Sequence, residues 1–138
     1  MAAKDIYHDA VRNALESDGW IVTDDPLSID FGDVKMKIDL GAEQLIAAEK
    51  EGQKIAVEIK TFLGTSTIYE FHTALGQFFN YRFALKIEDP ERILYLAIPL
   101  STYDDFFSRR FTQMIMEEAQ LKLIVFEPIQ EAIVKWKN

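Results

Sequence analysis

Residues 38–62 read IDLGAEQLIAAEKEGQKIAVEIKTF and contain two apolar runs separated by Glu51 and Gly52. Two such runs around a short polar turn are typical of a β-hairpin, although Glu-Gly is weaker turn chemistry than Asn-Gly. On the second run Glu58 and Lys60 stand two residues apart, which places both side chains on one face of an apolar strand. A charged pair is costly there unless the protein uses it, so this pair is the main indication of function.

Composition indicates one globular domain over residues 1–138, because 49% of the residues are apolar and 28% are charged. No apolar run approaches the roughly 20 residues of a membrane helix, and the start of the chain, MAAKDIYHDA, does not resemble a signal peptide. We therefore expect a cytoplasmic protein without membrane contact. The absence of cysteine and the presence of only His8 and His72 exclude disulfides, thiolate chemistry and an all-histidine zinc site.

The net charge of −8 limits the partners that the free chain can bind. Proteins that neutralise DNA phosphates normally have a basic surface, and the nearest candidates here are Arg109, Arg110 and Lys122. We therefore expect DNA binding by the free monomer to be weak. An acidic chain suits a divalent metal ion or a basic protein partner.

Apolar spacing, caps and breakers predict the other elements. The order αβββαβαβα describes an α/β fold with a mixed sheet flanked by helices. The segment 24–37 is rich in aspartate, and its elements are not placed. In chain order we expect a helix over 5–17, a strand over 19–23, the hairpin, a helix over 67–86, a strand over 92–100, a helix from Ser101 or Thr102 to 119, a strand over 121–126 and a helix over 128–136.

The helix over 67–86 begins with Thr67 and Glu70, whose spacing is that of a capping box. Gln77 and Tyr81 lie four residues apart, so they share one helix face, away from the principal apolar stripe. We expect that stripe to be formed by Ile68, Phe71, Leu75, Phe78 and Leu85.

A two-residue turn over 51–52 fixes the register of the hairpin, because residues whose numbers sum to 103 then face each other. Leu45 opposes Glu58 in this register. Glu43 opposes Lys60 and shares the face of the charged pair.

Two further acids lie on the first strand of the hairpin. Glu49 opposes Lys54, roughly 13 Å along the strand from the partner of Glu58, so we expect it to pair with Lys54. Asp39 shares the face of Glu58 only if the strand extends or bends back through Gly41.

Two carboxylates that converge with one lysine suit a magnesium ion that activates water against a phosphodiester. Oxygen ligands hold the ion, and the ammonium group orients the nucleophile or stabilises phosphate charge. The alternative is an exposed cross-strand pair, because alternating strands often produce Glu-x-Lys by chance. The acidic residues on the preceding strand and the capped helix after the hairpin favour the site.

The element order, with Glu58-Ile59-Lys60 on the second hairpin strand, resembles the PD-(D/E)XK, or restriction endonuclease-like, superfamily. More closely, DIYHDAVRNALESDGW (5–20), the hairpin segment 38–62 and ALGQFFNYR (74–82) resemble the XisH family, named as fdxN element excision controlling factors. This resemblance implies developmentally programmed excision of a DNA element in cyanobacteria. It also implies two partners, a site-specific recombinase and a small companion protein called XisI.

The superfamily pattern implies an aspartate at the start of the first hairpin strand, which is Asp39, whereas the register favours Glu43. Both stay open as metal ligands beside Glu58, with Mg²⁺ as the cofactor and Lys60 assisting. No proline precedes Asp39, which departs from the superfamily signature. Asp39, Glu58 and Lys60 are thus the predicted catalytic residues.

Three further residues have a role only by resemblance. Gln77 and Tyr81 resemble a Gln-x-x-x-Tyr motif that supports the active site in some nucleases of the superfamily, and the alternative is a half-buried aromatic side chain. His8 occupies a position where related nucleases often carry a glutamate beside the metal, and a surface or capping histidine is the more common explanation.

Two functions of different classes therefore fit the sequence. One is a Mg²⁺-dependent endonuclease that assists DNA element excision, and the other is an inactive accessory protein whose nuclease fold is a scaffold for XisI or the recombinase. The acidic charge and the missing proline favour the scaffold somewhat. Its interface, with a companion or a second copy in a homodimer, is then expected on the third helix at Phe106, Phe107, Arg110 and Phe111, unless the aromatic residues are core.

Overall fold

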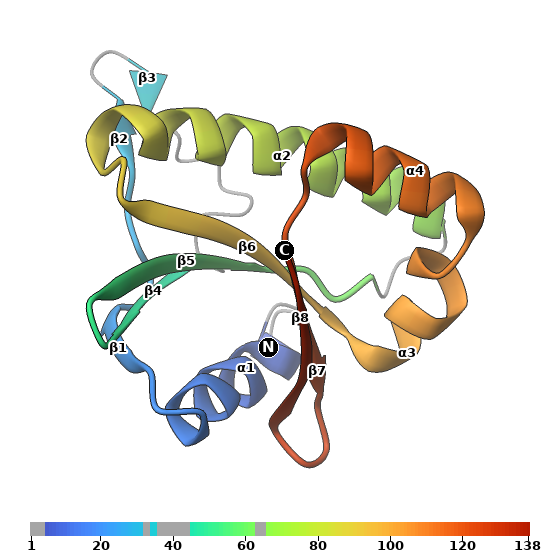
Figure 1. Cartoon of the computed structure of the whole chain (residues 1–138), viewed down its shortest axis with the longest axis horizontal. Helices are drawn as coiled ribbons and strands as arrows, with labels where there is room; N and C mark the ends of the chain where they lie inside the picture. Colours follow the sequence, from blue (N-terminus) through green and yellow to red (C-terminus); the bar gives the residue numbers. More distant parts are fainter. Residues whose placement is uncertain (1–4, 32–33, 36–44, 63–65) are drawn as a thin grey trace.

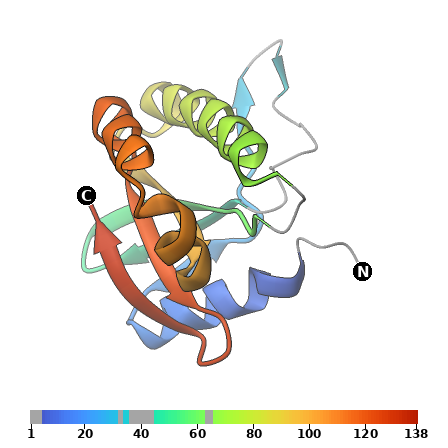
Figure 2. The same cartoon turned by 90° about the vertical axis from the view of Figure 1, so that its right-hand side faces the viewer.

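Figures 1 and 2 show the computed structural model of the chain, which describes residues 5–31, 34–35, 45–62 and 66–138. A mixed sheet runs through the described residues, with six strands in the order β1-β4-β5-β6-β7-β8. Strands β5, β6 and β7 are parallel to one another, and the other neighbours are antiparallel. The strands are β1 Ile21–Asp24, β4 Leu45–Lys50, β5 Gln53–Ile59, β6 Arg92–Pro99, β7 Leu123–Glu127 and β8 Ala132–Lys137.

Helices cover both faces of the sheet, as Figure 2 shows. Helix α1 (Asp5–Ser17) packs on one face, and helices α2 (Thr67–Glu88) and α4 (Arg110–Ala119) pack on the other. One core cluster lies beneath each layer of helices. The predicted α/β class, a mixed sheet flanked by helices, is confirmed. The unplaced segment 24–37 contributes a short ladder of β2 (Asp30–Phe31) with β3 (Val34–Lys35).

The hairpin has the predicted register, since Leu45 pairs with Glu58 and Lys50 pairs with Gln53. Its turn residues Glu51 and Gly52 have φ values of 51° and 83°. Positive φ at both central positions is what the tightest hairpin turns require, and glycine adopts it without the steric strain of a side chain. The two-residue turn therefore decides which side chains of the hairpin face each helix layer.

The last element of the chain is a strand, so the terminal helix predicted from Pro128 is wrong. After Pro128 the chain turns back, and backbone amides of Ile129 and Gln130 donate to the Glu127 carboxylate. Strand β8 then pairs antiparallel with β7. Its sequence AIVKWK is rich in β-branched and aromatic residues, which fit the edge of a sheet better than a helix.

Helix α2 is capped by Ser66 and not by Thr67, because the Ser66 hydroxyl accepts from the backbone amide of Tyr69. Its buried face also differs from the predicted stripe. Ile68 is exposed, whereas Tyr81 lies in the core. The helix carries apolar residues on both faces, so periodicity alone did not separate the inner face from the outer one.

The predicted third helix is divided into α3 (Leu100–Thr102), a π-helical segment over Tyr103–Phe107, and α4. Pro99, not Ser101 or Thr102, precedes its first turn. The wider π-helical turn allows the adjacent Phe106 and Phe107 both to point into the core. Both rings make edge-to-face contacts with Phe71.

The length and composition of the helices bear on membrane contact. Within the ranges that the structure describes, no helix combines the length and the apolar content needed to cross a bilayer.

Candidate metal and catalytic site

Glu58 lies in the interior of the protein, on the strand between β4 and β6. Its strand neighbours are Leu45 and Leu96, and both belong to the core cluster on the α2 side of the sheet. The residue is 1% exposed. Strand β5 is buried on both faces from Ile55 to Ile59, so this acid lies in the core and the alternative of an exposed cross-strand pair does not hold.

The Glu58 carboxyl has an unsatisfied oxygen. Among the described residues, its Oε1 has no hydrogen-bond partner. Burial raises the pKa of Glu58 to about 8, against the opposing charge of Lys60. An ionised carboxylate in apolar surroundings needs a compensating charge, which a proton or a bound cation supplies. A buried oxygen without a partner is therefore an observation that fits a divalent metal ligand.

Lys60 lies just beyond the end of β5 and is half-buried. Its backbone amide donates to the carbonyl of Ala97 on β6 at 3.0 Å, so the hydrogen bonding between β5 and β6 continues one residue past Ile59. Extended backbone keeps the side chains of Glu58 and Lys60 on one face. The charge of Lys60 accordingly acts on the buried carboxyl and lowers its pKa against the effect of burial.

The other two predicted ligands, Asp39 and Glu43, lie outside the described residues. The confirmed pairing of Leu45 with Glu58 is the register from which the position of Glu43 was predicted. Within the described ranges, no group of three or more histidine and acidic side chains gathers as metal ligands. The choice between Asp39 and Glu43 as the second ligand beside Glu58 stays a prediction.

Glu49 stands opposite Lys54 as predicted, but the two side chains form ion pairs with other residues. Lys54 Nζ contacts Asp89 at 2.9 Å, and Glu49 contacts Arg92 at 3.7 Å. The expected Glu49–Lys54 pair is wrong because Asp89 at the end of α2 pairs with Lys54, and Arg92 at the start of β6 pairs with Glu49. Glu49 is nevertheless separate from the Glu58 site.

Gln77 and Tyr81 lie on the helix that covers Glu58. Tyr81 is 3% exposed and belongs to the same core cluster as Leu45 and Leu96, the neighbours of Glu58. The prediction that this pair lies away from the apolar face is therefore wrong for Tyr81. Gln77, one turn earlier, is half-buried. Support of the site by these two side chains stays a prediction.

His8 belongs to a polar cluster with Asp25 and Arg12, which no sequence pattern indicated. Its Nε2 forms a hydrogen bond with Asp25 Oδ1 at 2.7 Å, and Arg12 Nη1 donates to Asp25 Oδ2 at 2.7 Å. Burial lowers the pKa of His8, but hydrogen bonds and charges of Asp25 and Asp9 outweigh this effect, so the pKa is raised. In the sequence, Asp25 before Pro26 looks like an ordinary turn residue. In the structure, it connects α1 to the end of β1 through these hydrogen bonds.

The Asp25 cluster predicts a pH-dependent stability. Replacing Asp25 with asparagine removes charge-assisted hydrogen bonds to two partly exposed cations, and we expect a loss of about 2 kcal/mol in unfolding free energy. The pKa of His8 is raised in the folded protein. The contribution of protonated His8 to the unfolding free energy is therefore present below the ordinary pKa of 6.5, and it disappears as pH rises through the folded pKa. Urea unfolding should therefore show a larger loss at pH 6 than at pH 8.

The neighbouring acid provides the control for this measurement. Asp9 contacts His8 Nδ1 at 3.3 Å, but its side chain is 85% exposed. Asp9→Asn should change the unfolding free energy by less than about 0.5 kcal/mol. An equal loss for Asp25→Asn at both pH values would show that His8 is not the titrating partner.

Comparisons with known proteins give a consistent result. The model of the XisH family, described as XisH protein, matches residues 1–134. An XisH family protein from Nostoc punctiforme is 52% identical, with a TM-score of 0.89 over 97% of this chain and 100% of that one. An fdxN element excision controlling factor protein from Anabaena variabilis is also 52% identical, with a TM-score of 0.89 over 97% of this chain and 99% of that one. No curated protein matches the chain.

Proposed function

Because this chain belongs to the XisH family, and a solved relative is described as an fdxN element excision controlling factor, we propose that it controls excision of a DNA element. We further propose a restriction endonuclease-like site in which Glu58, with Asp39 or Glu43, holds Mg²⁺ for phosphodiester cleavage. The observation that carries this proposal is the buried Glu58 oxygen without a hydrogen-bond partner among the described residues.

Each residue has a separate task in this site. Mg²⁺, when bound, supplies a Lewis acid that activates water and neutralises phosphate charge. Glu58 offers a carboxylate oxygen from a rigid central strand, and the surrounding apolar layer excludes bulk water, which strengthens its interaction with a cation. Lys60, on the same face, orients the attacking water or a phosphate oxygen. Gln77 and Tyr81 support the site from helix α2.

A nicking assay tests the nuclease proposal. Supercoiled plasmid is incubated with the wild type in MgCl₂ or EDTA, and the variants Glu58→Ala and Lys60→Met are compared. We expect nicking only with metal, and a loss of roughly 10²-fold or more in each variant. Glu49→Ala is the matched control, since it removes an acid from the neighbouring strand outside the site. Equal nicking by all four proteins would contradict the proposal.

The outer face of α2 favours a second function, a scaffold that binds protein partners. Large apolar side chains are exposed along this helix, whereas Phe106 and Phe107, where the interface was first expected, are core. A helix with apolar residues on both faces is normally covered on both. We therefore assign the companion surface, for an XisI-type protein or the recombinase, to the outer face of α2. Its exposed members are Ile68, Tyr69, Phe79, Phe83 and Ile87.

The scaffold function predicts a large effect from this face. Replacing Tyr69 and Ile87 with serine should weaken binding of an XisI-type companion by roughly 100-fold, because each removes about 1.5 kcal/mol of apolar burial. Phe111→Ser on α4, which alters an equally exposed aromatic residue, should change affinity less than about fivefold. Calorimetry with purified companion measures the affinity, and sedimentation of the chain alone detects a homodimer. A larger loss of affinity in Phe111→Ser than in the Tyr69 and Ile87 variant would show that the interface lies on α4.

A further inference from the structure

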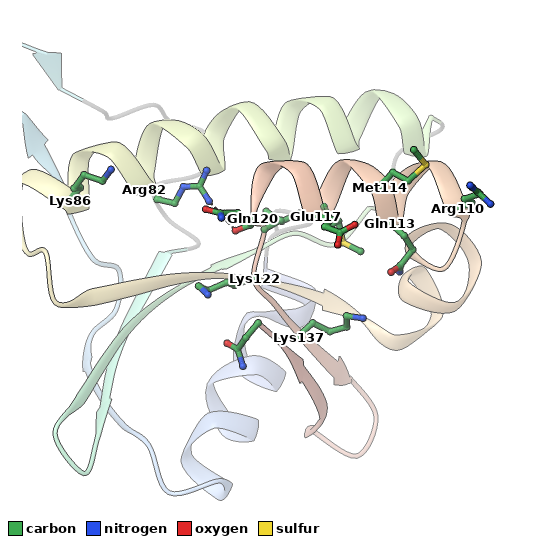
Figure 3. A pocket seen from close by; sticks show the side chains of 12 residues that line it. Arg82, Lys86, Arg110, Gln113, Met114, Glu117, Gln120, Lys122 and Lys137 are labelled. Atoms are coloured by element: carbon green, nitrogen blue, oxygen red, sulfur yellow. Dashed lines mark hydrogen bonds between the residues drawn. The ribbon is translucent and has the colours of Figure 1, made fainter.

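A groove lies between α2, α4 and the ends of β7 and β8, on the α2 side of the sheet (Figure 3). It encloses about 1020 Å³ and is open to solvent. Helix α4 and the C-terminal half of α2 form its walls, and Lys137 and Asn138 close one side. This volume is at the upper end of the range typical of ligand sites.

The groove concentrates positive charge on an acidic protein. The chain has 15 lysines and arginines against 23 aspartates and glutamates. Of the described residues that line the groove, Glu117 is the one acidic side chain. Such a gathering of one sign of charge creates a local attraction for anions despite the overall charge of −8. In the described part of the chain, five cationic side chains line the groove: Arg82, Lys86, Arg110, Lys122 and Lys137.

Four of these cations are available to a ligand. Within the described part of the chain, neither Lys86, Arg110, Lys122 nor Lys137 forms an ion pair. Other cations of the protein are paired, as Lys54 is with Asp89. Unpaired cations repel one another in a shared groove, and an anionic ligand relieves that repulsion.

Arg82 has a different task, because it builds the wall of the groove. Its Nη1 donates to the carbonyls of Ala119 and Gln120 at 2.9 and 3.0 Å. These carbonyls belong to the C-terminal end of α4, where a cation is favourable. Arg82 therefore fixes α4 against α2, and the other four cations line the groove without an ion pair among the described residues.

The groove is separate from the Glu58 site but shares its face of the sheet. Glu58 pairs with Leu96, Leu96 with Leu123, and Leu123 with Lys137, so the four residues form one row across the sheet. Three strand spacings put Lys137 about 14 Å from Glu58. The two leucines between them are buried, so the groove does not open onto the Glu58 carboxyl.

We propose that this groove binds the sugar-phosphate backbone of DNA. Lysine and arginine, with the side-chain amide of Gln120, offer hydrogen-bond donors suited to phosphate oxygens. No aromatic side chain lines the groove among the described residues, so the contact is to phosphates and not to stacked bases. The choice of DNA over an acidic protein segment rests on the proposed function in DNA excision.

Fluorescence anisotropy with a labelled duplex of about 20 base pairs tests this inference at two salt concentrations. Lys86→Glu and Lys122→Glu should each lower the affinity of the full chain at least tenfold. Each should also reduce the slope of log affinity against log salt by about 1. Lys135→Glu is the matched control, since it makes the same charge change on an exposed residue outside the groove, and it should lower affinity less than about threefold.

Equal losses of duplex affinity in all three variants, or no duplex binding at low salt, would overturn the inference. So would a polyglutamate peptide that binds more tightly than DNA and loses affinity in the two groove variants. Mg²⁺ titration of the same samples keeps the two proposals apart. Groove variants that lose DNA but keep Mg²⁺ binding support the groove. Failure of Mg²⁺ binding in the wild type, with groove-dependent DNA affinity intact, would count against the Glu58 site alone.

Discussion

Replacing Glu58 with glutamine is expected to make the metal-free protein more stable above pH 8 and slightly less stable near pH 5. The cause is the buried carboxyl, whose pKa is raised from 4.5 to about 8 by burial, with Lys60 as the opposing charge. In the unfolded chain this carboxyl ionises near its ordinary value. In the folded protein it keeps its proton until about pH 8.

The sign of the effect follows from proton binding. Between pH 4.5 and about 8 the folded state holds more protons at Glu58 than the unfolded state, so stability falls as pH rises. The slope approaches 1.4 kcal/mol per pH unit, and the accumulated loss is on the order of 5 kcal/mol. Glutamine has nearly the same shape and no titration. Its unpaired buried amide lowers stability by roughly 1–2 kcal/mol at every pH.

Urea unfolding in EDTA between pH 5 and pH 9 measures this difference. The unfolding free energy of Glu58→Gln, relative to the wild type, should rise steadily to about pH 8 and then level off. Glu49→Gln is the control, because its side chain is 47% exposed and its variant should show no comparable trend. A stability difference for Glu58→Gln that is constant across this range would contradict a raised pKa.

The second large effect is expected in metal affinity. Mg²⁺ requires an ionised carboxylate, so binding at Glu58 releases the proton that the metal-free protein holds. Affinity should therefore increase up to tenfold per pH unit between about pH 6 and pH 8, and then become constant. Calorimetry in two buffers with different heats of ionisation should detect about one proton released per Mg²⁺ at pH 7.

Lys60 affects the pH range over which the Mg²⁺ affinity rises. Its charge lowers the pKa of Glu58 against the effect of burial. Lys60→Met removes this charge, so the rise of Mg²⁺ affinity should extend to higher pH than in the wild type. A pH-independent affinity in both proteins would show that the ion binds at carboxylates other than Glu58.

The hairpin was predictable because its determinants are local. A two-residue turn fixes the register of the hairpin. Because side chains point to alternate faces along a strand, Glu58 and Lys60 then lie on one face. The apolar residues around Glu58 favoured its burial but left an exposed cross-strand pair open, and the packing of helices on both faces of the sheet decides for burial. The partners of Glu49 and Lys54 were not predictable, since Asp89 at the end of α2 and Arg92 at the start of β6 lie 35 or more residues away in the chain.

The errors arose where tertiary contacts outweigh local pattern. The segment after Pro128 has helix-compatible residues, but the open edge of β7 provides backbone partners for a strand. Helix α2 is apolar on both faces. Its sequence therefore did not show that Tyr81 is buried in the core whereas Phe79 is exposed. The division of the third helix depends on a π-helical turn, for which the sequence has no clear signature.

The cationic groove could not have been predicted from the sequence. Its cations are spread from residue 82 to residue 137 on two helices and two strand ends, and no local run of positive charge reveals them. Arg110 and Lys122 were considered as phosphate contacts, but Lys86 and Lys137 join them only through the packing of α2 against α4 and the return of β8.

Calorimetric titration of MgCl₂ into the wild type and Glu58→Gln at pH 8.5 tests the central claim most directly. At this pH the Glu58 carboxyl is largely ionised, so protonation does not mask binding. We expect one Mg²⁺ per wild-type chain and no binding, or at least 100-fold weaker binding, in the variant. Equal binding by both proteins, or by neither, would contradict a magnesium site at Glu58.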